Sequence, residues 1–102
     1  MKKSIIYKAL EDYQLYLQID AEMTEESELN AVFGCKQYLE QSQPVSKEWL
    51  LNNSLILSKV LKHYHHILDN DIRDAKYIGD KEELERLRNN RNQLRSILKI
   101  LE

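Results

Sequence analysis

Apolar residues recur at helical spacing along most of this sequence, and that periodicity limits the possible folds more than any other feature. At 100° per residue, one face of a helix collects Ile5, Ile6, Ala9, Leu10, Tyr13, Tyr16 and Leu17. The chain has only two glycines and one proline, so few positions resist a helical backbone. We therefore expect an all-α protein. A length of 102 residues predicts a single domain spanning 1–102.

Polar segments separate the first two expected helices. The first has Ser4 as its N-cap and ends near Asp20. The second is capped by Thr24 and has glutamates in its first turn, where the positive end of the helix dipole stabilises them. Its inner row is Leu29, Val32, Phe33 and Leu39, and the only proline of the chain follows it. Both helices are expected to pack on the C-terminal half.

The third expected helix begins after the N-cap Ser46 and reaches Ile78 in one piece. Its apolar face comprises Trp49, Leu50, Ile56, Leu57, Val60, Leu61, Tyr64, Ile67, Leu68, Ile72, Ala75 and Ile78. Two interruptions have to be weighed. "DNDIRD" (69–74) contains weak helix formers, and the polar "NNS" (52–54) is a candidate turn of a helix-turn-helix. The leucines keep one phase through "NNS", so we favour a continuous helix.

The clearest boundary in the sequence precedes the fourth expected helix. Gly79 is suited to end the third helix in a left-handed conformation, and Asp80 and Glu83 have the spacing of a capping box. The seam of the fourth helix is Leu84, Leu87, Leu94, Leu98 and Leu101. Arg91 occupies one seam position and Ile97 lies beside it. The sequence thus predicts a small four-helix bundle with a long C-terminal antiparallel helical hairpin.

All three histidines lie in "HYHHILD" (63–69), where pairs at i, i+3 and i, i+4 can bind a metal ion from one helix. The pairs are His63 with His66, and His65 with Asp69. These side chains diverge around the helix, and no second pair elsewhere completes a four-ligand shell. We therefore expect no metal and no cofactor, and we rank an enzyme or metal protein at these residues below other functions.

The single cysteine, Cys35, excludes an internal disulfide and fits a reducing compartment. It lies at the edge of a core row, so we expect a buried, inert thiol rather than a catalytic nucleophile. "MKKSIIYKALED" lacks the uninterrupted apolar run of a signal peptide, and no stretch approaches the ~20 apolar residues of a membrane span. We expect a cytoplasmic protein with no catalytic residues and no membrane partner.

The segment "RLRNNRNQLRSILK" (86–99) has five cations and no acid in a chain of net charge −2. Four of these cations share one arc beside the leucine seam, and we call them the basic stripe: Arg88, Arg91, Arg95 and Lys99. One explanation is pairing with a neighbouring helix, within one copy or within a dimer; the N-terminal half can supply partners, because nine acidic and five basic residues give residues 1–48 a net charge of −4. The others are binding of an acidic protein partner and contact with nucleic-acid phosphates.

Three leucines lie outside the apolar faces of their helices and predict self-association: Leu15, Leu51 and Leu55. Together with the basic stripe as a partner-binding surface, they indicate a non-enzymatic helical interaction protein, a small regulator, inhibitor or adaptor that binds another protein and forms a homodimer. The alternative is a nucleic-acid-binding regulator that uses the basic stripe. The sequence pI of about 5.9 counts against that alternative.

Overall fold

A computed structural model describes residues 3–20, 26–41 and 44–102, and these residues form helices with no strand. The elements are α1 (Lys3–Leu15), a short π-helical turn η1 (Tyr16–Asp20), α2 (Glu26–Glu40), α3 (Lys47–Asn52), α4 (Ser54–Ile78) and α5 (Lys81–Leu101). The expected all-α class and helical bundle are therefore confirmed. The cap expected at Thr24 lies outside the described residues.

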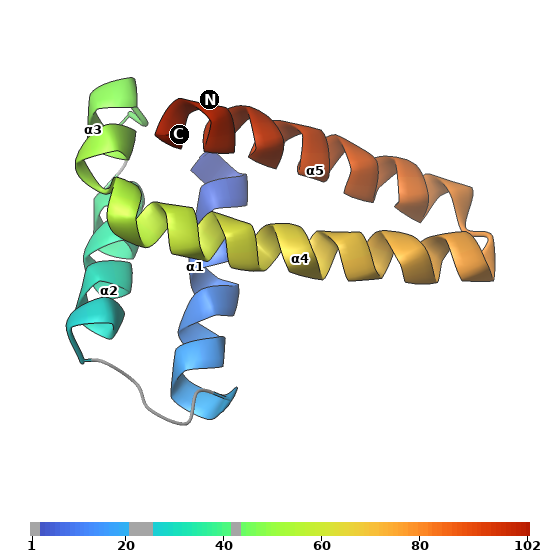
Figure 1. Cartoon of the computed structure of the whole chain (residues 1–102), viewed down its shortest axis with the longest axis horizontal. Coiled ribbons are helices and arrows are strands. Elements are labelled where there is room, and N and C mark those ends of the chain that lie inside the picture. The colour runs from blue at the N-terminus through green and yellow to red at the C-terminus, as the bar shows by residue number, and fades with distance from the viewer. Residues whose placement is uncertain (1–2, 21–25, 42–43) are drawn as a thin grey trace.

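The two longest helices, α4 and α5, form the predicted C-terminal antiparallel hairpin (Figure 1). Helices α1 and α2 lie side by side, run in opposite directions and cross one end of the hairpin (Figure 1). The short helix α3 packs beside the C-terminal end of α5. The other end of the hairpin, with the turn at residues 79–80, extends beyond α1 and α2.

The buried side chains form one cluster to which every helix contributes. Its largest fully buried members are Ile6, Leu10, Val32, Leu39, Leu50, Leu57, Val60, Leu61, Leu68 and Leu94. Burial of such apolar side chains supplies about 1.5–3 kcal/mol each relative to exposure, which makes this cluster the main source of stability. Among the described residues, no polar or charged side chain falls in the fully buried class.

Three of the predicted helix boundaries are confirmed. The Ser46 hydroxyl accepts a hydrogen bond from the backbone N–H of Trp49 at 3.0 Å. The carboxylate of Asp80 accepts one from the backbone N–H of Glu83 at 3.1 Å. Gly79 ends α4 with φ of 85°, in the left-handed region where a side chain would be strained. Gly79 and Asp80 thus define the two ends of the turn that joins α4 to α5, and Ser46 defines the start of α3.

The continuous helix expected from Ser46 to Ile78 is wrong, because the chain turns a corner at Asn53 (Figure 1). The Asn53 side-chain amide donates to the carbonyl oxygen of Trp49 at 2.8 Å. An asparagine side chain can compete in this way with the helical backbone, and α3 ends before Asn53, after six residues. The other candidate interruption, residues 69–74, is regular helix within α4.

Several finer predictions are also wrong. Ser4 lies inside α1 rather than at its N-cap, because the helix already includes Lys3. Phe33 is exposed, since α2 is packed through Val32, Cys35 and Leu39 instead.

Two further residues expected on apolar faces are exposed. Tyr16 begins the π-helical turn, where the regular helical phase of α1 ends. Ile78 lies at the hairpin tip, which no described helix covers. Conversely, Ile97 is buried, whereas it was expected only beside the seam.

Candidate protein-interaction surfaces

The basic stripe is held in part by the helix that faces it. Arg91 Nη1 donates to Asp69 Oδ1 at 3.2 Å, and the Arg91 side chain is largely covered. Arg95 Nε donates to His65 Nε2 at 3.1 Å. Both partners lie on α4, so within the described ranges the stripe pairs across the hairpin and not with the N-terminal half. Within one copy of the chain, the described acids of the N-terminal half therefore form no ion pair with the stripe.

The two contacts belong to one network, which we call the hairpin polar cluster: His65, Asp69, Arg91 and Arg95. His65 Nδ1 lies 3.2 Å from Asp69 Oδ2, so the Asp69 carboxylate contacts both His65 and Arg91. Because His65 Nε2 accepts from Arg95, the network assigns the imidazole proton to Nδ1. His65 therefore contacts both the Asp69 carboxylate and the Arg95 guanidinium.

The other two members of the basic stripe are available to a partner. Arg88 and Lys99 are both exposed, and neither makes an ion pair with any residue that the structure describes. Arg88 also lines a shallow cleft on α5 with Leu84 and Asn92. The four residues predicted as one partner-binding site thus differ: Arg91 is largely covered and Arg95 is exposed, and both contact α4, whereas Arg88 and Lys99 are exposed without such a contact.

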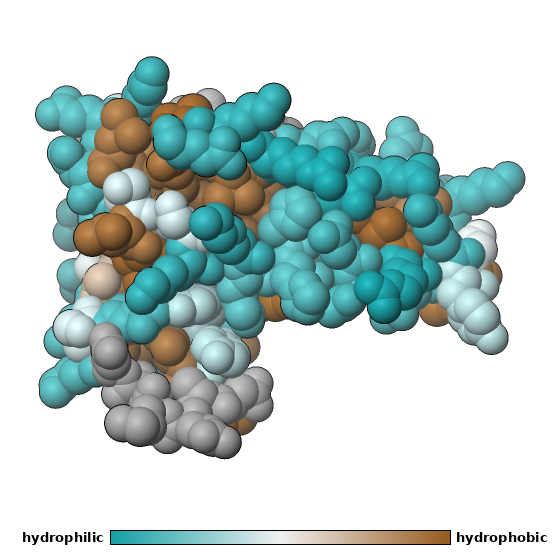
Figure 2. Space-filling model, viewed as in Figure 1, coloured by the Kyte–Doolittle hydropathy of each residue, from teal (hydrophilic) through white to brown (hydrophobic). Residues whose placement is uncertain are grey.

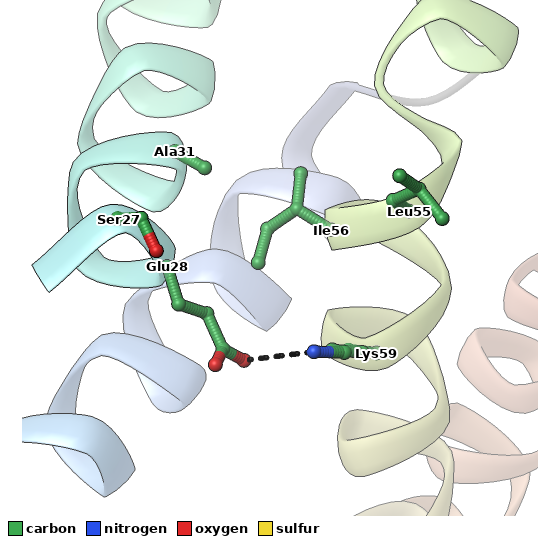
Figure 3. A pocket seen from close by; sticks show the side chains of 6 residues that line it. All are labelled: Ser27, Glu28, Ala31, Leu55, Ile56 and Lys59. Atoms are coloured by element: carbon green, nitrogen blue, oxygen red, sulfur yellow. Dashed lines mark ion pairs between the residues drawn. The ribbon is translucent and has the colours of Figure 1, made fainter. Parts of the chain in front are cut away.

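An apolar groove of about 360 Å³ separates α2 from α4 (Figure 3). We call it the α2–α4 groove; it is lined by Ser27, Glu28, Ala31, Leu55, Ile56 and Lys59. Ile56 points from α4 toward α2, and an ion pair between Glu28 and Lys59, 3.9 Å long, closes one end (Figure 3). Glu28 also accepts a hydrogen bond from the Tyr13 hydroxyl, which fixes the carboxylate in place.

Leu55 is the most prominent apolar side chain at the groove. It is 88% exposed, and Leu51 on the preceding helix is 45% exposed. Figure 2 shows hydrophobic residues gathered over α3, the start of α4 and the C-terminal end of α5, whereas the hairpin face is mostly hydrophilic. The half-buried Ile100 and Leu101 lie at that same end of α5. Leu51 and Leu55 therefore belong to an apolar end of the molecule.

Leu15, the third residue predicted for self-association, is on a different surface. It ends α1 and is 54% exposed, with Ile19 of η1 four residues further along the chain. It does not line the α2–α4 groove. The structure thus gives Leu51 and Leu55 a common neighbourhood at the α3–α4 corner and leaves Leu15 outside it.

The histidines point in different directions from α4. His63 packs against the rings of Tyr13 and Tyr16, with ring centroids 5.3 and 4.9 Å away, while His66 is exposed. Burial lowers the pKa of His63, and its buried Nδ1 has no hydrogen-bond partner among the described residues. Across the described parts of the chain, no group of three metal-ligating side chains converges.

The thiol of Cys35 is buried, as expected from its place beside a core row. Burial raises the pKa of Cys35 to about 11, which leaves the thiol protonated at neutral pH. Its sulfur lies 3.8 Å from the side-chain oxygen of Asn53. The contact links α2 to the corner between α3 and α4.

The sequence did not predict the α2–α4 groove or the contact of Asp69 with Arg91. A groove depends on how two helices pack, which periodicity within each helix does not specify. The i, i+4 spacing of His65 and Asp69 was visible, but it was read only as a metal-ligand spacing. Their position opposite Arg91 and Arg95 in an antiparallel hairpin was the signal that would have found the hairpin polar cluster.

No protein-family model matches this chain, and searches of the curated proteins and of the solved structures give no match. None of the helices in the described ranges is long and apolar enough to span a lipid bilayer.

Proposed function

We propose that this chain is a non-enzymatic helical interaction protein of the cytoplasm, a small regulator, inhibitor or adaptor that acts by binding another protein and that forms a homodimer. The exposure of Leu55 at the α2–α4 groove carries this proposal. An apolar side chain that is 88% exposed beside an apolar groove gains free energy when a partner covers both. The buried, protonated thiol of Cys35 supports a role without nucleophilic catalysis.

A second copy of the chain is the partner that best fits the groove. In a twofold symmetric dimer the same surface of both copies meets, so it must contain both a protruding side chain and a recess. The α3–α4 corner offers Leu55 as the protrusion and the groove as the recess. The opposite charges of Glu28 and Lys59 at the groove make the surface electrostatically complementary to itself.

The exposed part of the basic stripe supports binding of a different, acidic protein. Arg88 and Lys99 remain free of ion pairs within the described residues, so they reach solvent at full charge. Arg91 is already paired with the Asp69 carboxylate, which reduces the positive charge open to a nucleic acid. We therefore keep protein binding ahead of nucleic-acid binding for this surface.

Sedimentation equilibrium of the wild type and of a Leu55→Asp variant tests the dimer. We expect a dimer at micromolar concentration for the wild type and a monomer for the variant, because a carboxylate cannot be buried unpaired in an apolar interface. Tyr77→Asp is the matched control, since Tyr77 is 94% exposed at the hairpin tip, far along α4 from the groove. A monomeric wild type at high concentration would contradict the proposal, as would equal loss of the dimer in both variants.

The nucleic-acid alternative is tested by a salt titration of duplex DNA binding. For this protein we expect no measurable binding at physiological salt. Binding that weakens with a log–log slope near −0.9 per phosphate contact, and that is lost in an Arg88→Glu/Lys99→Glu variant, would favour the alternative instead.

A further inference from the structure

A second group of cations lies on α4 beside the basic stripe of α5. Asp69 contacts Arg91 and His65 contacts Arg95 across the hairpin, so one side of α4 borders the stripe directly. At 100° per residue, three exposed cations lie within about 40° of Asp69 around α4, and we call them the α4 row: Lys62, Arg73 and Lys76. The α4 row and the basic stripe together make one surface, the hairpin basic face.

Most cations of the hairpin basic face have no acidic partner. Six of them are exposed and form no ion pair within the described ranges: Lys62, Arg73, Lys76, Arg88, Arg95 and Lys99. Arg73 donates only to the side-chain oxygen of Asn70, at 3.4 Å, which leaves its charge unbalanced. Asp69, the acid between the two rows, already contacts Arg91 and His65. The face therefore carries positive charge that a partner can balance.

The acids of α4 other than Asp69 lie on the side opposite the α4 row, toward α1. Burial raises the pKa of Asp71, and the like charges of Asp74, Glu83 and Asp12 raise it further, while Arg86 opposes them. Asp12 belongs to α1, so these carboxylates are near one another at the junction of α1 with the hairpin. Charges of opposite sign are thus separated onto two sides of the hairpin, and the basic side faces away from α1.

The shape and composition of the face favour a protein partner over a nucleic acid. Single-stranded nucleic acids are held largely by stacking of bases on aromatic rings, and neither row contains Phe, Tyr or Trp. The face consists of two antiparallel helices side by side (Figure 1), about 20 Å across, which is wider than the ~12 Å major groove of DNA. The net charge of −2 on the whole chain also opposes long-range attraction to a duplex.

Carboxylates on a flexible chain match the face better. The α4 row is about 21 Å long at 1.5 Å per residue, and an extended peptide advances about 3.3 Å per residue, so about seven residues span it. The cations are unequally spaced over two helices, and a flexible chain can adjust its side chains to each of them. The arginine guanidinium groups can each donate two parallel hydrogen bonds to one carboxylate.

We propose that the hairpin basic face binds an unfolded acidic segment of another protein, a run rich in Asp and Glu. The segment lies along the hairpin, and its carboxylates contact cations of both rows. The inference rests on the proposed binding of an acidic protein and specifies which part of that partner is recognised. Because the cations are exposed, the attraction is screened by salt, and binding weakens as the ionic strength rises.

Fluorescence anisotropy with a labelled peptide of about eight residues, rich in Glu and Asp, tests the inference. The comparison ligands are the same peptide with Gln and Asn in place of its acids, duplex DNA and oligouridine. We expect binding of the acidic peptide alone, weakened at least ten-fold between about 0.1 M and 1 M sodium chloride, as the Debye length falls from ~10 to ~3 Å. No binding of the acidic peptide at millimolar concentration, equal binding of the amide peptide, or tighter binding of either nucleic acid would overturn the inference.

Charge-reversal variants connect the binding to the face. Lys62→Glu on α4 and Arg88→Glu on α5 are each expected to weaken peptide binding about three-fold or more, with melts close to that of the wild type. Lys47→Glu is the matched control, since Lys47 is an exposed cation of α3 that forms no ion pair with the described residues. Equal loss in the control would show non-specific attraction. Loss in only one of the two test variants would contradict a face built from both helices.

The Leu55→Asp variant separates this inference from the proposed dimer. Leu55 is not part of the hairpin basic face, so this variant should bind the peptide as tightly as the wild type. Loss of peptide binding in Leu55→Asp would mean that the dimer, and not the hairpin, forms the site. Absence of peptide binding by a wild type that sediments as a dimer would refute the acidic segment alone and leave the proposed self-association in place.

Discussion

Arg91 donates from Nη1 to Asp69 Oδ1 at 3.2 Å and so joins α5 to α4 across the hairpin. The two residues are 22 apart in the sequence, and the contact lies beside the leucines that pack the two helices. Arg91 occupies a seam position that an apolar residue would normally fill. Polar residues at seam positions specify the register of paired helices, and Asp69 gives Arg91 a partner in one register of this hairpin.

Substitution of Asp69 by asparagine is expected to destabilise the protein. The Arg91 guanidinium is largely covered, and its buried Nε lacks a partner within the described ranges, so removal of the carboxylate leaves a charge poorly compensated. We expect a loss of about 1 kcal/mol, which lowers Tm by roughly 4–8 °C in a domain of this size. Asp74→Asn, at an exposed position of the same helix, is the control for a thermal melt and should leave Tm nearly unchanged.

Charge reversal within the basic stripe should separate its two halves. Arg91→Glu places a carboxylate against that of Asp69, and like charges at this distance repel. Arg88→Glu changes an exposed side chain, and exposed charges contribute only ~0–1 kcal/mol. Circular dichroism melts should therefore show a marked loss of stability for Arg91→Glu alone. Equal melting temperatures for the two variants would mean that the Asp69 contact contributes nothing.

The helices were predictable from the sequence because each has its own apolar period, and the caps at Ser46, Gly79 and Asp80 mark boundaries by local chemistry alone. The corner at Asn53 was not predictable from the sequence. The leucines on either side of it keep the phase of one helix, since both helices bury those leucines in the same core. Periodicity reports which residues are buried, and two helices that meet at a corner can satisfy the same pattern.

The apolar period of each helix also made part of the candidate surfaces predictable. Exposure of Leu51 and Leu55 follows from their place outside the apolar face. The groove beside Leu55 requires the packing of α2 on α4, which no single-helix pattern contains. The stripe was correctly located on α5, but its partners depended on the register of the hairpin.

His63 is expected to make stability depend on pH. Burial lowers its pKa below the ordinary value of 6.5, with His66 adding to the shift and Asp12 opposing it. Below about pH 6.5 the unfolded chain therefore binds a proton that the folded chain resists, so the contribution of His63 is complete above this pH and is lost as the pH falls. The urea midpoint should drop between pH 7.5 and pH 5.5.

His63→Phe should reduce that drop, because phenylalanine can keep the ring contacts with Tyr13 and Tyr16 without titrating. His66→Gln, at an exposed position, serves as the control and should retain most of the pH dependence. If His63→Phe loses as much stability as the wild type over the same pH range, another group is responsible.

Asn53 should be required for the corner between α3 and α4. Its side-chain amide donates to the Trp49 carbonyl at 2.8 Å, and its side-chain oxygen faces the Cys35 sulfur at 3.8 Å. Asn53→Ala removes both contacts and improves the helix propensity at the corner, so it weakens the corner relative to a straight helix. We expect a loss of about 1 kcal/mol in a urea titration, the usual contribution of one such hydrogen bond.

Trp49, the only tryptophan, offers a local signal for this change because it stacks on Tyr38 with ring centroids 4.6 Å apart. Its fluorescence should change in folded Asn53→Ala, since a shift of α3 alters this stacking. The neighbouring Asn52→Ala is the matched control: Asn52 is exposed, and its side chain makes no hydrogen bond within the described ranges. Asn53→Ala with wild-type stability and wild-type fluorescence would mean that packing of Leu50 and Leu57, and not the asparagine, determines where the chain turns.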